Sequence, residues 1–230
     1  MLNIDPTLAT VHAVGAVTKI SFISGHIAGA LTSRTDDIAK WCATLAPTAS
    51  LRTGAVTTDI AALLQSFGFT QARELVLLER DLDGFNTSIA IQDWAVSAWR
   101  CHSAARIDAQ AFPIGWDMTR SEITHALQAT TYSGIAFVNQ GRQRIGYALV
   151  GTSLDHAYLQ RIAVLPPAQG LGFGALLTES CLRWAAERGA AKMFVNTESD
   201  NQPALRLYQR FGFELCGERL FVMEKAATSR

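Results

Sequence analysis

The chain has 230 residues, of which 49% are hydrophobic and 17% are charged. This composition is too apolar for a disordered chain and is sufficient for one large core or two small ones. Twenty basic and twenty acidic side chains cancel, so no overall field favours nucleic acid, anionic lipid or a substrate of either charge.

The cysteines and the start of the chain exclude further classes of protein. Cys42, Cys101, Cys181 and Cys216 form no Cys-x-x-Cys pair and have no histidine at ligand spacing. Buried thiols are therefore expected, with neither a metal site nor a disulfide framework. The first residues lack the basic and apolar regions of a secretory signal, and no apolar run reaches the roughly 18 residues of a membrane-spanning helix. We expect a cytoplasmic protein that binds no membrane.

The first part of the chain predicts strands and a helix but no ligand-binding turn. Strands are expected near residues 11–23 and 51–57, and a helix at residues 35–45 with Thr35 or Asp36 as its N-cap. No glycine-rich turn precedes a helix in this part, so it contains no evident site for an anion.

One motif occurs twice in the sequence. LLQSFGF at residues 63–69 recurs as LYQRFGF at residues 207–213, and each copy is followed by a short apolar segment that ends in charge. Each copy predicts a helix, a Phe-Gly-Phe turn and a strand, because glycine can take a positive φ at the helix end. A generic helix-to-strand corner would explain either copy alone, whereas duplication explains both together with the matching strands.

The repeat leads to a prediction about domains. A polar, glycine-containing stretch at residues 81–88 separates the copies and has the composition of a linker. We interpret residues 1–83 as a degenerate, partial copy and residues 84–230 as the domain that carries the function. The earlier copy would cover an edge of the sheet of the later one or extend its cleft.

Strands and helices alternate in residues 84–230, after a hairpin, which predicts a mixed α/β sheet. The expected elements are a strand at 88–94, helices at 104–111 and 121–130, a hairpin of 133–139 and 143–151 that turns at 140–142, a strand at 157–164, a helix at 173–188 ended by Gly189, a strand at 192–197, a helix at 203–211 and a strand at 218–223.

A glycine-rich turn joins the expected strand at 157–164 to the long helix. Its sequence is Gln169-Gly170-Leu171-Gly172-Phe173-Gly174. Glycines let the backbone approach a ligand closely, several N–H groups point outwards together, and the helix start adds roughly half a positive charge. The turn therefore predicts a pyrophosphate site that needs no lysine.

Other glycine-rich turns fit this sequence less well. The spacing is Gly-x-Gly-x-Gly rather than the Gly-x-Gly-x-x-Gly of dinucleotide-binding folds, and the Lys-Ser/Thr of a P-loop is absent. The turn also follows antiparallel strands. A purely structural turn is the remaining alternative.

A second motif, NQPALRLYQRFGF at residues 201–213, follows the turn. Together, Gln-x-x-Gly-x-Gly and Asn-x-x-Ala-x-x-Leu-Tyr-x-x-x-Gly-Phe resemble the GNAT superfamily of N-acetyltransferases over about residues 88–225. The resemblance is nearest in type to the ribosomal-protein N-terminal acetyltransferases. It implies the GNAT acyl-CoA N-acyltransferase fold and the transfer of acetyl from acetyl-CoA to a primary amine, by direct attack in a ternary complex and without a metal.

The resemblance also implies roles for individual residues. The main chain at Ile162, Ala163 and Val164 would pair with the pantetheine arm of the cofactor, the turn from Gln169 to Gly174 would hold its pyrophosphate, and Asn201 would contact the arm. Tyr208 matches the tyrosine that protonates the departing thiolate, for which a phenol with an ordinary pKa near 10 is a suitable donor. Ordinary packing is the alternative role for Tyr208.

Several residues are candidates for the base that accepts the proton of the amine. The segment around Asn196 resembles the stretch that supplies a glutamate in the ribosomal-protein type, but the spacing places there an amide, which cannot act as a base. Glu198 is the nearest carboxylate, and we predict it as the second catalytic residue. Asp155 and His156 are further candidates, and Gln160 stands where other members have a carboxylate. An amine that arrives neutral needs no base.

The segment at residues 111–116 is expected to bind the acceptor, because in the resembled family this region covers the cleft opposite the cofactor. A role in closing the core fits these apolar residues equally well. The acceptor is expected to be a small-molecule amine or a peptide, and the oligomeric state, a homodimer included, stays open. A non-catalytic acyl-CoA-binding sensor is the alternative function, motivated by the missing glutamate. An interaction protein without a cofactor is the third.

Overall fold

A computed structural model describes residues 9–14, 17–22, 42, 50–86, 91 and 93–227 of the chain. The described residues form two compact units. The first comprises those within Met1–Leu77, Thr197–Asp200 and Gly217–Arg230, and the second comprises those within Leu78–Asn196 and Asn201–Cys216. The glycine turn, Asn201 and Tyr208 all belong to the second unit.

The first unit combines helix α3 with a sheet in the order β1-β2-β3-β9-β4. β1 is antiparallel to β2, β2 is parallel to β3, and β3 is antiparallel to β9. Its elements are β1 (Ala9–Val14), β2 (Val17–Phe22), β3 (Ser50–Thr57), α3 (Thr58–Ser66) and parts of β4 (Thr70–Asp81) and β9 (Glu214–Lys225).

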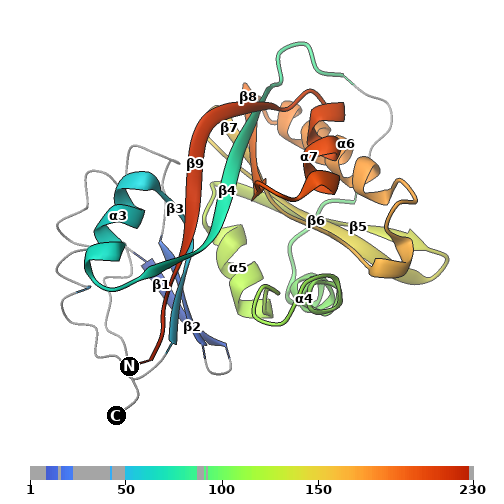
Figure 1. Cartoon of the computed structure of the whole chain (residues 1–230). Helices are drawn as coiled ribbons and strands as arrows, with labels where there is room; N and C mark the ends of the chain where they lie inside the picture. The colour runs from blue at the N-terminus through green and yellow to red at the C-terminus, as the bar shows by residue number, and fades with distance from the viewer. Residues whose placement is uncertain are drawn as a thin grey trace. The chain divides into compact units, whose positions relative to one another are not determined.

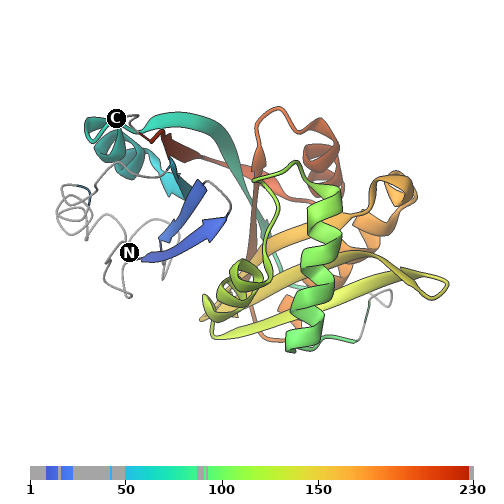
Figure 2. The ribbon, with the colours of Figure 1, turned by 90° about the horizontal axis from the view of Figure 1, so that it is seen from below.

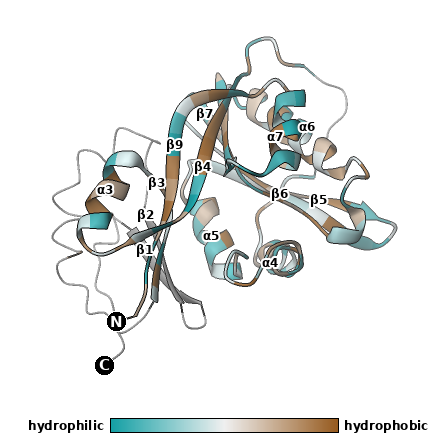
Figure 3. Cartoon of the chain, in the orientation of Figure 1, coloured by the Kyte–Doolittle hydropathy of each residue, from teal (hydrophilic) through white to brown (hydrophobic). Residues whose placement is uncertain are grey.

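The core of the first unit lies between α3 and the strands. α3 has a hydrophobic and a hydrophilic side (Figure 3), and Ile60, Ala61 and Leu64 are its buried residues. Apolar side chains spaced three and four residues apart share one face of a helix. They pack with Val56 and Met223 in one apolar cluster.

The predicted helix, Phe-Gly-Phe turn and strand are present in both copies of the motif. α3 and α7 (Gln202–Arg210) are each 9 residues long, and β4 and β9 are each 12. Gly68 and Gly212 have φ values of 81° and 75°. In each copy the second Phe donates its N–H to the carbonyl five residues earlier, of Leu64 or Tyr208. The duplication that we infer from the motif stays a prediction.

The sheet of the second unit has the order β4-β8-β7-β6-β5. The three antiparallel strands are β5 (Tyr132–Gln140), β6 (Gln143–Ser153) and β7 (His156–Val164), and β8 (Lys192–Glu198) pairs with β7 in parallel. The predicted hairpin is confirmed, with Gly141 at a φ of 61° in its turn.

Helices cover both faces of this sheet. α4 (Ala98–Ala111) and α5 (Arg120–Gln128) lie on one face, and α6 (Phe173–Ala186) lies on the other with α7 beside it (Figure 1). α4 crosses in front of β5 and β6 when the unit is seen from below (Figure 2). α5 starts at a capping box in which Thr119 and Glu122 bond each other's main-chain N–H, which satisfies two amides at the helix start.

Most predicted elements are confirmed, with ends that move by a few residues. α4 starts earlier than predicted because the Ser97 side chain accepts the N–H of Arg100 as an N-cap. The predicted strand at 88–94 lies partly outside the described residues, and Ile91, Asp93 and Trp94 are not in a strand. Instead, the N–H of Ile91 donates to the Ser180 hydroxyl of α6. Apart from Cys42, the predicted helix at 35–45 lies outside the described residues.

Candidate active site

The glycine turn is built from the end of β7 to the start of α6. A short 3-10 helix, Pro166–Ala168, redirects the chain after β7. The Gln169 side chain then reaches back and donates from Nε2 to the carbonyl of Val164, 3.0 Å away. Gly170 and Gly172 have φ values of 76° and 88°, which disfavour any residue with a Cβ atom. Two glycines are thus required by the path of the chain.

The amides that follow Gln169 in this turn have no hydrogen-bond acceptor among the described residues. Leu176 is the first residue of α6 whose N–H bonds within the helix, to Gly172 at 3.1 Å. In the part of the chain that the structure describes, the N–H groups of residues 170–175 donate no hydrogen bond. A Cβ atom placed on Gly170 or Gly172 would meet nothing within 4 Å. Unpaired amides at a helix start, facing open space, fit the pyrophosphate of coenzyme A.

One edge of β7 opens towards this turn. β7 pairs with β8 only from His156 to Tyr158, whereas on its other edge it pairs with β6 up to Val164. Among the described residues, the later part of β7, which includes Ile162 and Ala163, therefore has no strand on the β8 side. Such an edge presents main-chain donors and acceptors that an extended amide-containing ligand can pair with.

A β-bulge interrupts β7 just before this open stretch. Leu149 of β6 pairs with Arg161, and the next residue, Val150, pairs with Leu159. Gln160 is the extra residue, and it has no counterpart on β6. Bulges redirect side chains and are common beside active sites. Here Gln160 Nε2 donates to the Ala126 carbonyl of α5 at 2.8 Å, while its Oε1 is buried without a partner among the described residues.

α7, which carries Tyr208, packs against the start of α6. Asn201 is the N-cap of α7 and accepts the N–H of Ala204 through its side chain. A Cβ atom on Gly174 would lie 3.4 Å from Leu207 Cδ2, so α7 contacts the first turn of α6. Tyr208 is 4% exposed and packs edge-on against Phe213, with ring centroids 5.7 Å apart.

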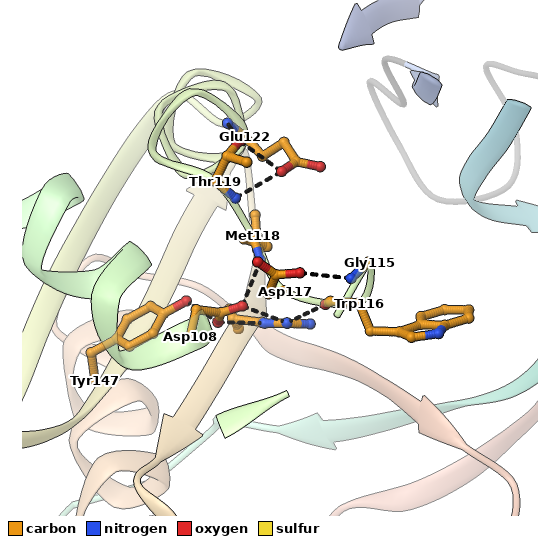
Figure 4. A network of polar contacts seen from close by, with 9 residues as sticks. Asp108, Gly115, Trp116, Asp117, Met118, Thr119, Glu122 and Tyr147 are labelled. Atoms are coloured by element: carbon orange, nitrogen blue, oxygen red, sulfur yellow. Dashed lines mark hydrogen bonds and ion pairs between the residues drawn. The ribbon is translucent and has the colours of Figure 1, made fainter. Parts of the chain in front are cut away.

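A buried carboxylate organises the opposite face of the sheet, and the sequence analysis missed it. Asp108 of α4 is fully buried and accepts hydrogen bonds from Tyr147 Oη at 2.6 Å and from Arg161 Nε and Nη2 at 2.9 and 2.7 Å. It also accepts the N–H of Met118 at 2.6 Å. Four donors therefore converge on one carboxylate (Figure 4).

This network fastens the loop between α4 and α5, which contains the predicted acceptor segment. Arg161 Nη2 donates to the carbonyl of Trp116 at 2.7 Å, and its guanidinium carbon lies 3.5 Å from the centroid of the Phe112 ring. Asp117 accepts the N–H of Gly115 (Figure 4). The loop is thus held at both ends by the pair of Asp108 and Arg161.

Burial and pairing shift the pKa values of this network. Burial, reinforced by the charge of Asp108, raises the pKa of Tyr147 well above its ordinary value, so the phenol stays a donor. Burial opposes the charge of Arg161, but the hydrogen bonds and charge of Asp108 outweigh it and raise the pKa of the guanidinium. The sequence offered one clue to this network: Asp108 is a charged residue on the same side of α4 as Ala104 and Ile107, which are apolar and buried.

The match to a family model decides the class of protein. The model of the acetyltransferase (GNAT) family matches residues 92–213, more than half of the chain. The chain belongs to the GNAT family of acetyltransferases. This confirms the resemblance inferred from the two motifs, and the α/β GNAT fold with its mixed sheet is confirmed as well.

Individual relatives differ in what they share with this GNAT chain. A mycothiol acetyltransferase from Nocardioides sp. is 28% identical over 180 residues, which are 66% of this chain and 61% of the relative. A ribosomal protein bS18-alanine N-acetyltransferase from Haemophilus influenzae is 32% identical over 107 residues, 46% of this chain and 70% of the relative. The chain therefore spans about three fifths of the length of the first of these relatives, 61%.

The fold is shared with a solved GNAT structure over nearly the whole chain. A GCN5-related N-acetyltransferase from Sphaerobacter thermophilus superposes with a TM-score of 0.59 at 14% identity, and the match covers 96% of this chain and 76% of that one. Likeness at this identity concerns the fold alone. Within the described residues, no helix is long and apolar enough to cross a membrane, and no cluster of side chains could hold a metal ion.

Two of the candidate bases lie far along β7 from the glycine turn. Asp155 and His156 stand at the start of β7, the end of the strand remote from the glycine turn, and they pair with each other at 3.4 Å. At roughly 3.3 Å per residue, about 26 Å of strand separates His156 from Val164. Asn196 is exposed, and Glu198, which ends β8, is half-buried and belongs to the first compact unit. The role of Glu198 stays a prediction.

Proposed function

We propose that this GNAT chain transfers an acetyl group from acetyl-CoA to a primary amine of a small molecule or a peptide, in a ternary complex. The observation that carries the proposal is the row of unpaired amides at residues 170–175, in the part of the chain that the structure describes, with open space beside Gly170 and Gly172. Membership of an acetyltransferase family supports the same reaction. The relatives' names describe acceptors as different as mycothiol and a ribosomal protein, so the acceptor class needs evidence from this chain.

The proposed binding residues follow the open edge of β7 into the glycine turn. The main chain of Ile162, Ala163 and Val164 would pair with the amide-containing arm of the cofactor. The amides from Gly170 to Gly174, including those of Leu171 and Phe173, would bind the pyrophosphate. Gln169 shapes the turn through its bond to Val164, and Asn201 stands at the start of α7. When bound, acetyl-CoA supplies the acetyl group as a reactive thioester.

Two side chains are proposed to move protons. Tyr208 would donate its phenolic proton to the departing sulfur, and its burial beside α6 keeps water from competing. Attack requires a neutral amine, and Glu198 is the proposed acceptor of the amine's proton, directly or through water. Asn196 cannot take this role because its side chain is an amide.

The absence of a carboxylate at Asn196 favours a second candidate function. A chain that binds acyl-CoA but lacks a proton acceptor would act as a sensor. Isothermal titration with acetyl-CoA and a thiol-release assay across a panel of amines separate the two. Binding with release of CoA supports the enzyme, binding without release for any amine supports the sensor, and no binding overturns both.

The glycine turn can be tested with a matched pair of variants. Gly172→Leu and Gly189→Leu change residues just before and just after the same helix, each with a φ near 80° and nothing within 4 Å. Both should lose about 1–2 kcal/mol of stability through left-handed backbone strain. Only Gly172→Leu should weaken acetyl-CoA binding, by tenfold or more. Equal affinity in the two variants would remove the turn from the site.

Tyr208 can be tested separately from binding. Tyr208→Phe keeps the ring that packs against Phe213 and removes only the hydroxyl. General acid catalysis is typically worth about 10²- to 10⁴-fold, so kcat should fall by about a hundredfold or more while the Kd for acetyl-CoA stays the same. An unchanged kcat would leave Tyr208 with a packing role only.

A further inference from the structure

Arg161 lies on β7 at the start of the open edge of this strand. It follows the bulge residue Gln160 and precedes Ile162, where the open edge of β7 continues towards the glycine turn. Its side chain points to the face that carries α4, because it bonds Asp108. A group bound by Arg161 would therefore lie beside the proposed path of the cofactor arm and close to the reacting amine.

The guanidinium is held in place on three sides. Nε and Nη2 bond the two oxygens of Asp108, Nη2 also bonds the Trp116 carbonyl, and the Phe112 ring lies 3.5 Å from the guanidinium carbon. A planar fork fixed by a carboxylate and an aromatic face keeps its remaining donors in a set direction. Little conformational freedom is lost when such a group binds a ligand.

One nitrogen of the guanidinium, Nη1, donates no hydrogen bond to the described residues. In the part of the chain that the structure describes, no atom accepts a hydrogen bond from Arg161 Nη1. Nη1 is also not among the buried polar atoms that lack a partner, and the side chain is 20% exposed. Because Nε and Nη2 share the edge that faces Asp108, Nη1 lies on the edge that faces away from it.

We infer that Arg161 Nη1 binds the oxygen of an α-aminoacyl group, that is, an oxygen of the carbonyl or carboxylate group bonded to the carbon that bears the acetylated amine. The inference rests on the proposed function and names its acceptor class. Nη1 donates N–H bonds and so requires an acceptor oxygen. Since Asp108 balances the charge of Arg161, a neutral carbonyl satisfies the site as well as a carboxylate does. A free amino acid and the N-terminus of a peptide both present this group.

The test compares an acceptor that has this oxygen with one that lacks it. Alaninamide carries the α-aminoacyl carbonyl within a carboxamide group, and sec-butylamine has an ethyl group in place of the carboxamide. The ratio of their kcat/KM values is measured for the wild type and for Arg161→Lys, which keeps a positive charge for Asp108 but has no group equivalent to Nη1. Because the basicity of each amine is the same in both experiments, a change in the ratio reports on the protein.

We expect Arg161→Lys to lower the ratio by about ten- to a hundredfold, the usual effect of losing one hydrogen bond to a charged group. The loss should appear as a higher KM for alaninamide, and titration of CoA-loaded protein should show the same loss of alaninamide affinity. The Kd for acetyl-CoA should not change. Arg183→Lys, on the surface of α6, is the control and should keep the wild-type ratio.

A second variant keeps the inference testable if Arg161→Lys does not fold. Asp108→Asn with Arg161→Met removes both charges and also removes Nη1, so it should lose the preference for alaninamide. Alanine and a short alanyl peptide, as further acceptors, distinguish a free amino acid from a peptide N-terminus as the source.

Two results would overturn the inference. One is a ratio that Arg161→Lys leaves unchanged, and the other is a wild-type protein that neither binds nor acetylates any α-aminoacyl compound. Failure of the proposed function is a different result, namely no binding of acetyl-CoA or no acetylation of any amine in the wider panel.

Discussion

Replacing Asp108 with Asn should destabilise the second unit more than any surface charge change. Each carboxylate oxygen accepts two hydrogen bonds: Oδ1 from Met118 N and Arg161 Nη2, and Oδ2 from Tyr147 Oη and Arg161 Nε. An amide keeps one oxygen and puts two N–H groups in place of the other. At least one hydrogen bond from Arg161 must therefore be lost, and an N–H group of the new amide then faces an N–H group of the Arg161 guanidinium.

The magnitude follows from the bonds that are lost. A hydrogen bond that involves a charged group contributes about 1.5–3 kcal/mol, and removing one partner of a buried ion pair costs about 3–5 kcal/mol. Loss of two such bonds and loss of an ion-pair partner both place the cost at about 3–5 kcal/mol, a large part of the roughly 5–15 kcal/mol that stabilises an ordinary domain. For a chain of this size it corresponds to a fall in Tm of about 6–20 °C.

Urea unfolding at pH 7, followed by circular dichroism, measures this difference. Asp155→Asn is the control, because its side chain is 66% exposed and its pair with His156 should contribute less than about 1 kcal/mol. A double variant, Asp108→Leu with Arg161→Met, should regain part of the stability, since no buried charge is left unpaired. If Asp108→Asn costs no more than Asp155→Asn, the buried network does not support the fold.

Three further predictions concern stability and reactivity. Burial raises the pKa of Tyr147 well above 10, so the folded chain keeps a proton that the unfolded chain loses near pH 10. The unfolding free energy should therefore fall as the pH rises above 10. In Tyr147→Phe, this fall should be less steep. Thr119→Ala removes the capping box with Glu122 and should cost about 1 kcal/mol in urea unfolding, whereas Thr119→Ser should cost little. Burial raises the pKa of Cys181, while Cys216 is half-buried, so Ellman's reagent should modify Cys216 first and Cys181 only after unfolding.

Local chemistry made the glycine turn and α7 predictable from the sequence. Gly170 and Gly172 are needed where φ is positive, and Asn201 is a preferred N-cap that the structure confirms. Such features depend on residues within one or two turns of each other. Their geometry therefore appears in the sequence as a fixed spacing, which is why these elements were found with nearly the correct ends.

The network around Asp108 depends on distant contacts, and the sequence analysis did not find it. Asp108 bonds Tyr147 and Arg161, which lie 39 and 53 residues further along the chain. No spacing rule connects residues so far apart. The bulge at Gln160 likewise becomes visible only when β6 and β7 are paired, because the alternation of one strand does not show where its partner shifts register.

The two copies of the Phe-Gly-Phe corner separate structure from chemistry. Both corners make the same main-chain hydrogen bonds and bury the same position of the helix, Leu64 in one and Tyr208 in the other. Burial at that position therefore follows from the corner itself and is no evidence for catalysis. The hydroxyl of Tyr208, which Leu64 lacks, distinguishes the second copy at this position. A catalytic role for Tyr208 must consequently be judged by removal of the hydroxyl alone, with the ring left in its place.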